Sequence, residues 1–551
     1  MISPESSKES LPITAAAAAV ETLVGHGIDT LFALPGAQID HLFAALHDRT
    51  DRIRTITSRH EQGAAYMAFG YARSTGRPAV YSVVPGPGWL NASAALLTAY
   101  GCFAPVLSLA GQIPLRSIGR DYGELHEVPD QLGLARGLTK WAERVENPQE
   151  VSRQLASAVA AMQGGLTRPV HLEIPPDVMG APFGGRIEGA QSVIECQTPE
   201  QGDVERAAAL LSSAKRPVMF VGGGAQHCSS EVTQLAERLQ IPVVAFRAGR
   251  GVIDQRHYLS QHWPSAHRLW AEADVVLAVG TRLDFPLRMW GFDPEMEIIW
   301  IDQDSERPRK IIEPAVELIC DARTGLKGLL SAISPDVRQV SRKAEMEQRN
   351  ADSIAEFDRD MAPQMSYLRA IRSALPEDGI LVDELTQVGY ASWAWFPTYC
   401  PRSYITSGYQ GNLGYGFPSA LGVKVANPDR PVISLNGDGG FQFGSAELAT
   451  AAKYGIALTI LVFNDGWYGN VRRIQQERYG NRVFRSDLTN PDYQLLARSY
   501  GIASERVGSA EQLGSAIRRA IGTQGPYLIE VPVGELPTPW TTIVRPRVRG
   551  T

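Results

Sequence analysis

Short apolar runs alternate with amphipathic or alanine-rich segments along most of the 551 residues. Near the start, Thr14 precedes a segment in which Val20, Leu23 and Val24 recur at helical spacing, and a β-rich run follows at 30–34. This pattern predicts a helix with Thr14 as its N-cap, and then a strand. Helix and strand signals that alternate in this way are typical of α/β domains with parallel sheets.

One longer pattern occurs near both ends of the chain. At 77–111 and again at 430–465, a β-rich run after Arg-Pro leads into a glycine turn, an alanine-rich segment ending in Tyr-Gly, and a second apolar run. The glycine turns read GPG at 86–88 and GDG at 437–439. Each copy has the signals of a strand, loop, helix and strand, which is a βαβ unit. We therefore expect two related α/β domains that bracket the chain.

The middle of the chain has three apolar runs of its own, at 217–224, 274–282 and 297–304, each reaching a Gly or Asp. They predict a third doubly wound domain. Polar, proline-bearing stretches mark the joints at 183–200 and 334–361, and the charged second stretch predicts a helical linker. The chain should therefore form three parallel-sheet α/β domains, at 1–185, 186–340 and 341–551.

Composition favours a soluble protein that acts on small molecules. Hydrophobic residues make up 44%, charged residues 20%, and the formal net charge is −6. No basic run indicates a nucleic-acid partner, and no apolar stretch approaches the roughly 20 residues of a membrane span. The start has no signal-peptide pattern, and the cysteines lack CxxC spacing, which together favour a reducing, cytoplasmic location. The cysteines are Cys102, Cys196, Cys228, Cys320 and Cys400.

The strongest candidate for chemistry is the turn Gly437-Asp438-Gly439-Gly440, directly after the apolar run 431–435. A carboxylate at a strand end can ligate a hard cation, and glycines beside it let backbone amides approach a diphosphate. A lone GDG is more often a plain turn. A second carboxylate, Asp465, follows the next predicted strand, and parallel neighbours would bring both carboxylates to one edge of the sheet. The pair therefore favours a site for a metal ion and a diphosphate.

Two turns in the first domain are weaker candidates. Glu61 lies at the entry to the predicted helix 64–72, where a first-turn charge can serve only the helix dipole. Gly36 ends the strand at 30–34 and would let the backbone approach a ligand closely, although an ordinary turn explains it as well. Neither residue decides the function alone.

Together these segments resemble the thiamine-diphosphate-dependent enzymes of the acetolactate-synthase-like group. The resemblance runs from about Thr14 to the C-terminus, with the motifs RHEQGAAYMAFGYARSTG, GPGWLNA, SLAGQIP, GNLGYGFPSALG and GDGGFQFGSAELATAAKYG…FNDGWYG in the expected order. It implies a pyrimidine-binding, a central and a diphosphate-binding domain. It also implies an enzyme that uses thiamine diphosphate and Mg²⁺ to cleave or form a carbon–carbon bond of a 2-oxo acid or aldehyde.

The resemblance implies a role for each motif. Glu61 would activate the cofactor at its aminopyrimidine ring, and Leu413 would wedge the cofactor into a bent form. Asp438, Asp465 and the backbone carbonyl of Trp467 would ligate Mg²⁺. The other implied site residues are Gly36, Ala37 and Gln112 at the reacting centre, and Thr386, Gln387, Gly411, Gly437, Gly439, Gly440, Tyr468 and Gly469 at the cofactor.

Four positions depart from the group's pattern. Asp465 stands where the group more often has Asn. Phe285-Pro286 and Ile474 stand where true acetohydroxyacid synthases have an Asp-Arg pair and a specificity tryptophan. His126 aligns with a glutamine near the substrate, and its imidazole could move a proton there; the alternative is an exposed loop histidine. The cofactor residues therefore match the group, whereas the substrate pocket differs.

Three further points follow from the resemblance. Gly222–Gly224 with Asp302 and Asp304 could hold FAD, as in some relatives, but a glycine run alone is a weak signal. A non-catalytic, cofactor-binding regulatory paralogue is the alternative function, and the intact Glu61 weighs against it. The group also implies a homo-oligomer, either a dimer or a dimer of dimers, with each active site at a subunit interface.

Overall fold

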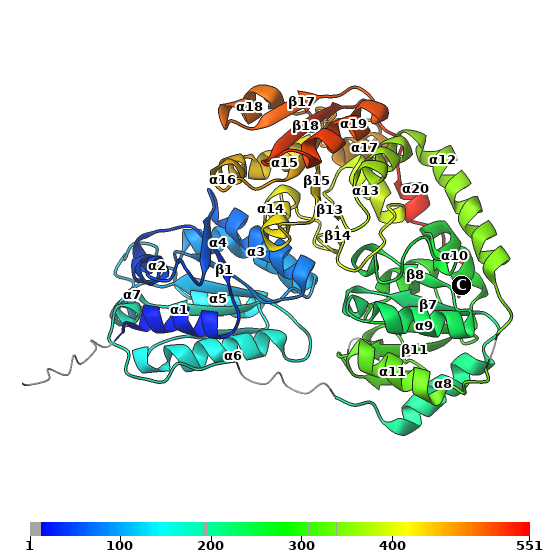
Figure 1. The fold of residues 1–551 in the computed structure, drawn as a ribbon, viewed down its shortest axis with the longest axis horizontal. Coiled ribbons are helices and arrows are strands. Elements are labelled where there is room, and N and C mark those ends of the chain that lie inside the picture. Colours follow the sequence, from blue (N-terminus) through cyan, green and yellow to red (C-terminus); the bar gives the residue numbers. More distant parts are fainter. Residues whose placement is uncertain (1–12, 191–196, 307, 338, 551) are drawn as a thin grey trace, which may run out of the picture. The chain divides into compact units, whose positions relative to one another are not determined.

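The computed structural model describes residues 13–190, 197–306, 308–337 and 339–550. It contains three six-stranded parallel sheets with helices on their faces, which confirms the predicted α/β class (Figure 1). The first sheet belongs to one compact unit, and the other two sheets share a second unit. The domain limits at 185 and 340 stay predictions.

Two sequence expectations concern cysteines and membranes. Cys196 lies outside the described residues, and the four described cysteines carry free thiols. No helix in the described ranges is both long and apolar enough to cross a bilayer. The cytoplasmic location stays a prediction.

The N-terminal sheet has the strand order β2-β1-β3-β4-β6-β5. Thr14 caps its first helix by accepting a hydrogen bond from the N–H of Ala17 at 3.2 Å, as the pattern predicts. Helices α1, α2 and α6 pack a buried apolar cluster against one face of this sheet. Helices α3 and α4 cover the other face (Figure 1). The elements are β1 (Thr30–Ala33), β2 (Arg54–Thr57), β3 (Ala79–Val83), β4 (Val106–Gly111), β5 (Trp141–Arg144), β6 (Val170–Ile174), α1 (Ala15–Gly25), α2 (Asp40–His47), α3 (Glu61–Thr75), α4 (Pro87–Gly101), α5 (Gln131–Leu138) and α6 (Val151–Gln163).

The C-terminal sheet has the order β14-β13-β15-β16-β18-β17. Counted from the first strand of each domain, this is the order of the N-terminal sheet. The internal repeat seen in the sequence is therefore a repeat of topology. The elements are β13 (Ile380–Val382), β14 (Tyr404–Ile405), β15 (Val432–Gly437), β16 (Thr459–Asn464), β17 (Ala503–Arg506), β18 (Tyr527–Pro532), α13 (Gln387–Ala394), α14 (Gly416–Ala426), α15 (Asp438–Gly444), α16 (Leu448–Lys453), α17 (Gly469–Arg478), α18 (Tyr493–Ser499), α19 (Ala510–Ile521) and α20 (Trp540–Ile543).

The central sheet has the different order β12-β11-β10-β7-β8-β9, which is the Rossmann order. The N–H groups of Gly222 and Gly224 donate to the carbonyls of Val279 and Gly280, both at 3.0 Å. These amides join β7 to β10 inside the domain, so they lend no support to the FAD alternative. The elements are β7 (Pro217–Val221), β8 (Val243–Ala245), β9 (Ser260–Gln261), β10 (Val275–Val279), β11 (Glu297–Asp302), β12 (Val316–Ile319), α8 (Gln201–Ser213), α9 (Ser229–Leu239), α10 (Trp263–Glu272) and α11 (Ala322–Ala332).

A long helix, α12 (Lys343–Ala374), joins the second and third sheets. It begins inside the stretch that we predicted to be a charged, helical linker and continues past the end of that stretch. Its backbone is kinked at Met361, two residues before Pro363. Phe357 and Met361 are fully buried, and the helix packs against α10 and α19. The joint is therefore part of the core and not a solvated connection.

Candidate active site

Two carboxylates meet at the carboxyl edge of the C-terminal sheet, as the sequence predicts. β15 and β16 are parallel neighbours with Gly437 opposite Phe463, so Asp438 and Asp465 follow adjacent strand ends. Burial raises the pKa of Asp438, which is 3% exposed. Burial and then the charge of Asp438 raise the pKa of Asp465 to about 6. A cation between the two carboxylates would offset both effects.

Neighbours that the sequence did not reveal orient Asp438. Its Oδ2 accepts hydrogen bonds from the N–H of Gly466 at 2.9 Å and from the side-chain amide of Asn490 at 2.7 Å. The amide of Asn490 also donates to Oδ1 of Asn464 at 3.0 Å. Asn490 therefore links the ends of β15 and β16.

Trp467 offers a third oxygen at the same place. Its N–H donates to Oδ1 of Asp465 at 2.9 Å. The segment 466–468 pairs antiparallel with 486–488, through two hydrogen bonds of 2.8 Å made by the residues that flank Trp467. In this pairing the N–H and C=O of Trp467 both point away from the partner segment, toward the side of Asp465.

These three oxygens fit a hard divalent cation. In the described ranges, no three or more His, Cys, Asp or Glu side chains gather closely enough to hold a metal ion. The candidate set instead combines two carboxylates with one carbonyl. Mg²⁺ commonly takes one or two carboxylates and completes its shell with phosphate oxygens and water. The donor set therefore suits Mg²⁺ beside a diphosphate.

The glycine turn is enclosed by the segments expected to hold the cofactor. Thr386 lies against Gly437, and the ring of Tyr468 lies against Gly439. Gln387, the first residue of α13, is 9% exposed, and its Oε1 has no hydrogen-bond partner among the described residues. Because a buried amide oxygen without a partner is unfavourable, Gln387 is suited to meet a ligand or its water.

Glu384 is a second residue that the sequence did not reveal. It is 1% exposed, and its Oε1 accepts a hydrogen bond from the N–H of Gly414 at 2.5 Å. A Cβ atom on Gly440 would lie 2.5 Å from the same oxygen, so only glycine fits there. Burial raises the pKa of Glu384 to about 8. An uncharged acid thus connects the glycine turn with the loop that carries Leu413.

The loop itself is a tight turn. Gly411 and Gly414 have left-handed φ values of +56° and +80°, and Leu413 is half-buried between them. Leu413 therefore lies next to Gly414, whose N–H is bonded to Glu384, within the same domain as Asp438.

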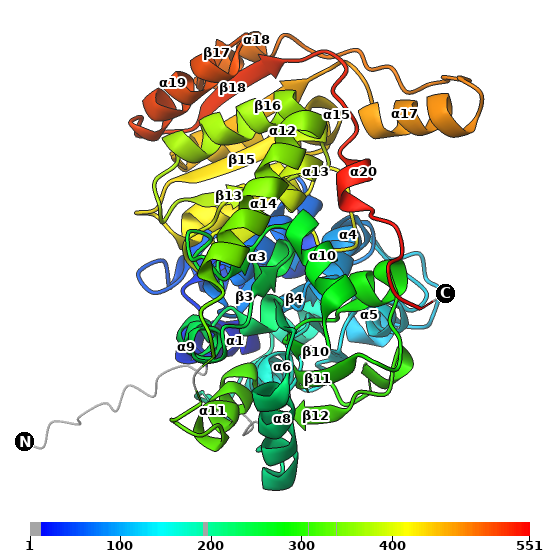
Figure 2. The same ribbon diagram turned by 90° about the vertical axis from the view of Figure 1, so that its right-hand side faces the viewer.

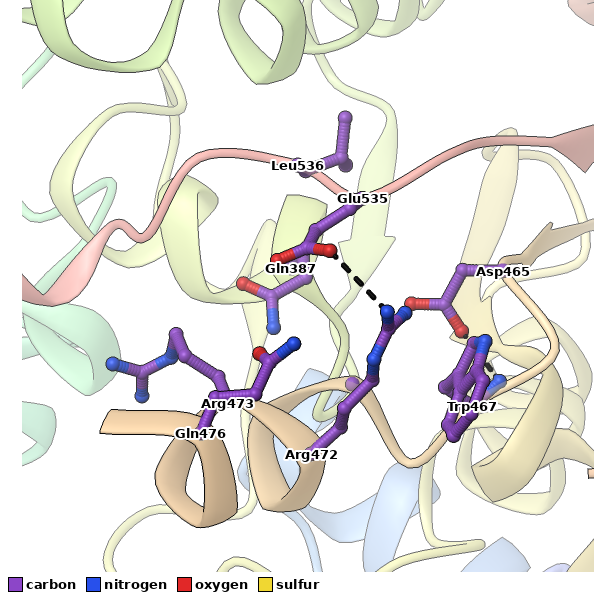
Figure 3. Close-up of a pocket in the computed structure, with 9 residues that line it drawn as sticks. Gln387, Asp465, Trp467, Arg472, Arg473, Gln476, Glu535 and Leu536 are labelled. Carbon is purple, nitrogen blue, oxygen red and sulfur yellow. Dashed lines mark hydrogen bonds and ion pairs between the residues drawn. The ribbon is translucent and has the colours of Figure 1, made fainter. Parts of the chain in front are cut away.

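An open hollow lies beside Asp465 (Figure 3). One wall is a single face of α17, and the C-terminal segment after β18 forms another. Its lining residues are Gln387, Asp465, Trp467, Gly469, Arg472, Arg473, Gln476, Glu535 and Leu536. The hollow thus continues from the expected cofactor residues, and most of its lining residues carry polar or charged groups.

In the N-terminal domain, Glu61 is the first residue of α3, and His60 caps that helix by accepting from the N–H of Gln62 at 3.1 Å. The Glu61 side chain is 15% exposed. Its Oε2 accepts from the amide of Asn91 at 3.1 Å, and its Oε1 lies next to Gly88. Glu61 is therefore tied to the GPG turn and not simply a solvated helix-start charge.

Gly36 and Ala37 reach the same edge of the N-terminal sheet. A Cβ atom on Gly36 would collide with Cγ1 of Val84 at the end of β3, which explains the glycine. Gln112 directly follows β4 and is 2% exposed. It donates to Oε1 of Glu173 at 3.1 Å, and its own Oε1 accepts from the N–H of Ile113 at 2.8 Å. Both ends of the Gln112 amide are thus engaged inside the domain.

The buried side chain of Glu173 holds several residues at this edge of the sheet through hydrogen bonds. Glu173 also accepts from Gln131 at 2.8 Å and from Arg144 at 2.6 Å. Although burial opposes its ionisation, the hydrogen bond and charge of His171, with Arg144, hold the pKa of Glu173 at about 2. Gln131 accepts from the N–H of Gly86 at 2.8 Å, so the network fixes the GPG turn.

His126 lies on a loop against that turn and is half-buried. Its φ of +67° is left-handed, and its carbonyl occupies the space that a side chain on Gly86 would need. Nδ1 of His126 lies 2.9 Å from Oε1 of Gln38, whose amide nitrogen donates to the carbonyl of Leu125 at 2.7 Å. Because that carbonyl can only accept, Gln38 turns its oxygen to the ring, so Nδ1 carries a proton and Nε2 is the acceptor when the ring is neutral.

Phe285 and Ile474 are the two other positions at which the sequence departs from the pattern of the group. Phe285 packs in an aromatic cluster of the central domain, 5.4 Å from Trp263 and 6.2 Å from Trp290 between ring centroids. Ile474 is half-buried on α17. Neither residue offers a charge to a substrate.

Comparison with known proteins agrees with this geometry. Three family models match the chain: the thiamine pyrophosphate enzyme N-terminal TPP binding domain at 13–134, the central domain at 204–329, and the C-terminal TPP binding domain at 386–531. A probable acetolactate synthase large subunit of Methanocaldococcus jannaschii is 32% identical, over 94% of this chain and 91% of that protein. A probable 2-ketoarginine decarboxylase of Pseudomonas aeruginosa is 33% identical, over 94% of each. An acetolactate synthase of Arthrospira platensis is 32% identical, over 95% of this chain and 94% of that protein.

Proposed function

Because the chain belongs to the acetolactate-synthase-like family of thiamine pyrophosphate enzymes, we propose that it uses thiamine diphosphate and Mg²⁺ to cleave or form a carbon–carbon bond beside the carbonyl of a 2-oxo acid. The observation that carries this proposal is the pair Asp438 and Asp465 at adjacent strand ends, beside the side-chain oxygen of Gln387, which has no hydrogen-bond partner among the described residues. Relatives named as acetolactate synthases and as a 2-ketoarginine decarboxylase support the 2-oxo acid class.

The residues of the C-terminal domain bind and orient the cofactor in this proposal. Asp438, Asp465 and the carbonyl of Trp467 would hold the cation. The residues that would contact the diphosphate are Thr386, Gln387, Gly437, Gly439, Gly440, Tyr468 and Gly469, and Gly411 and Leu413 would support the rest of the cofactor. When bound, thiamine diphosphate supplies a nucleophilic carbon for addition to a carbonyl.

The residues of the N-terminal domain move protons. Glu61 would face the aminopyrimidine ring of the cofactor and hold or release a proton at Oε1 or Oε2, and Asn91 fixes the orientation of this carboxylate. Nε2 of His126 accepts a proton from the bound substrate and returns it, because Gln38 holds the other ring proton on Nδ1. Gly36, Ala37 and Gln112 shape the space around the reacting atoms.

The proposed assembly is a homodimer or a dimer of dimers. Glu61 of one subunit meets the cofactor held by Asp438 of the partner subunit. Mixing inactive Glu61→Gln and Asp438→Ala proteins should restore turnover, because hybrid dimers contain one intact site. An active monomer in sedimentation experiments, or no recovery after subunit exchange, would contradict the shared site.

A panel of 2-oxo acids with thiamine diphosphate and MgCl₂ tests the reaction. Product analysis by mass spectrometry should show loss of CO₂ and either an aldehyde or a 2-hydroxy ketone. Acetolactate formation from pyruvate should be slow, since Phe285 and Ile474 offer no group for a second carboxylate. Cofactor binding without turnover of any 2-oxo acid would instead favour the non-catalytic regulatory paralogue.

A further inference from the structure

We propose that Arg472 recognises an anionic oxygen group of the ligand in the hollow beside Asp465, with Glu535 as its exchangeable partner in the free protein. The inference rests on the proposed function, because the anion is either the carboxylate of a 2-oxo acid or the diphosphate of the cofactor. Both present several oxygens that a guanidinium can bind through paired N–H donors.

The placement of α17 supports a binding role. Gly469, Arg472, Arg473 and Gln476 line the hollow at i, i+3, i+4 and i+7, which is one face of the helix. No residue of this described helix, Gly469–Arg478, is buried. Figure 2 shows α17 standing apart from the sheet of its domain. A helix without a buried face contributes little to a core, so its polar wall needs another explanation.

The two arginines on this wall differ in how they are engaged. Arg473 donates to Oδ1 of Asn470 at 2.6 Å and pairs with Glu477 on the same helix at 3.2 Å. Among the residues that the structure describes, Arg472 forms one ion pair, with Glu535, at 3.5 Å between Nη2 and Oε2. The Nε atoms of both arginines are buried without a hydrogen-bond partner in the described part of the chain. Arg473, however, uses both of its Nη atoms on its own helix, whereas Arg472 uses only Nη2. Arg472 is therefore the guanidinium with more unused donors.

The side chain of Arg472 is held in place for a ligand. Its guanidinium carbon lies 4.2 Å from the centroid of a Trp467 ring, a distance typical of a cation–π contact. Figure 3 shows the guanidinium between the carboxylates of Glu535 and Asp465. Trp467 thus fixes Arg472 at the mouth of the expected metal site.

Glu535 is a weak partner. Its side chain is 64% exposed, and exposed ion pairs contribute little because water screens the two charges. A ligand anion beside Asp465 would be less exposed to water, and charge-assisted hydrogen bonds there are stronger. Replacement of Glu535 by the ligand anion is therefore favourable.

Variants with opposite expected effects test this exchange. We would compare Arg472→Gln, Arg472→Lys and Glu535→Gln with the parent. Glu477→Gln is the matched control, because it removes the same charge as Glu535→Gln. Glu477 pairs with Arg473 and does not line the hollow. The two readouts are KM for 2-oxopentanoate and 2-oxoglutarate, and the Kd of thiamine diphosphate at fixed MgCl₂ by calorimetry.

Arg472→Gln should raise either KM or Kd about tenfold or more, because binding becomes weaker. Arg472→Lys should recover part of this loss of binding. Glu535→Gln should lower the same constant about two- to fivefold, since the competing carboxylate is gone. Glu477→Gln should leave both constants unchanged. A change in KM alone assigns the substrate carboxylate, and a change confined to 2-oxoglutarate assigns its distal group. A change in Kd alone assigns the diphosphate.

If no 2-oxo acid is turned over, the proposed function fails, and the Kd measurement still tests Arg472. Calorimetric titration with inorganic pyrophosphate and MgCl₂ adds a second probe in that case. The inference is overturned if both constants stay within twofold of the parent in folded Arg472→Gln protein. It is also overturned if Glu535→Gln weakens binding as Arg472→Gln does, because the pair would then be structural.

Discussion

The side-chain amide of Asn490 donates to the carboxylate of Asp438 at 2.7 Å, across 52 positions of sequence. The same nitrogen also lies 3.0 Å from Oδ1 of Asn464, the last residue of β16. Asn490 therefore fixes the rotamer of Asp438 relative to the neighbouring strand. A carboxylate that is held in this way before the cation binds loses less entropy on binding.

Asn490→Ala should weaken binding of thiamine diphosphate with Mg²⁺ about tenfold, because a hydrogen bond to a charged group is lost. Calorimetry on the folded protein measures this change. Gln494→Ala is the control, since this nearby amide donates to Glu530 and not to Asp438. Equal affinity in the Asn490 variant and the control would show that Asp438 needs no such support.

Glu61→Gln should retain the fold and most of the cofactor affinity but lose at least about a hundredfold in turnover, the usual scale for a positioned acid–base group. Proton exchange at the reactive carbon of the cofactor, followed by NMR, measures the step directly. Glu146→Gln, at an exposed glutamate of the same domain, should exchange normally. Normal exchange in Glu61→Gln would leave Glu61 with a helix-start role only.

Two variants at His126 separate the effect of backbone strain on stability from the effect of the imidazole on turnover. Because its φ is +67°, His126→Gly should be about 1 kcal/mol more stable than His126→Ala. Both variants should lose turnover about equally, at least tenfold, since both lack the imidazole. Asp121→Gly, in the same loop with a φ of +55°, should gain stability without losing turnover. Full turnover in both His126 variants would remove the imidazole from the mechanism.

Glu384 should make the stability of the free protein depend on pH. Its pKa is raised from 4.5 to about 8 on folding, so the folded state binds the proton more tightly. The free energy of unfolding should therefore fall as pH rises from about 4.5 to 8, by up to about 1.4 kcal/mol per pH unit, and then level off. Glu384→Gln should lack this fall. Parallel stability curves for the two proteins from urea unfolding would contradict a buried, protonated Glu384.

The paired carboxylates could be predicted from the sequence because their geometry follows from local signals. A strand that ends in Gly437-Asp438 and the next strand that ends before Asp465 need only be parallel neighbours to meet at one edge. The fold class followed in the same way, from apolar runs that alternate with helical segments and from one repeated unit.

The supporting residues could not be predicted, since their partners are distant in the chain. Gln38 reaches His126, Gln131 reaches Gly86, and nothing around these amides signals a role. Glu384 follows an apolar strand, where an acid could equally face water. The charged stretch before Met361 predicted a helical linker, and most of it is helical. Its packing into the core could not be predicted, because few apolar residues, such as Phe357, mark its buried face.

Thiamine diphosphate should bind at Asp438 through a divalent cation. Calorimetric titration of the protein with thiamine diphosphate, in MgCl₂ and in EDTA, tests it most directly, with Asp438→Ala alongside. We predict saturable binding in MgCl₂, loss of binding in EDTA, and no binding to folded Asp438→Ala in either buffer. Undiminished binding in EDTA or to Asp438→Ala would contradict the account.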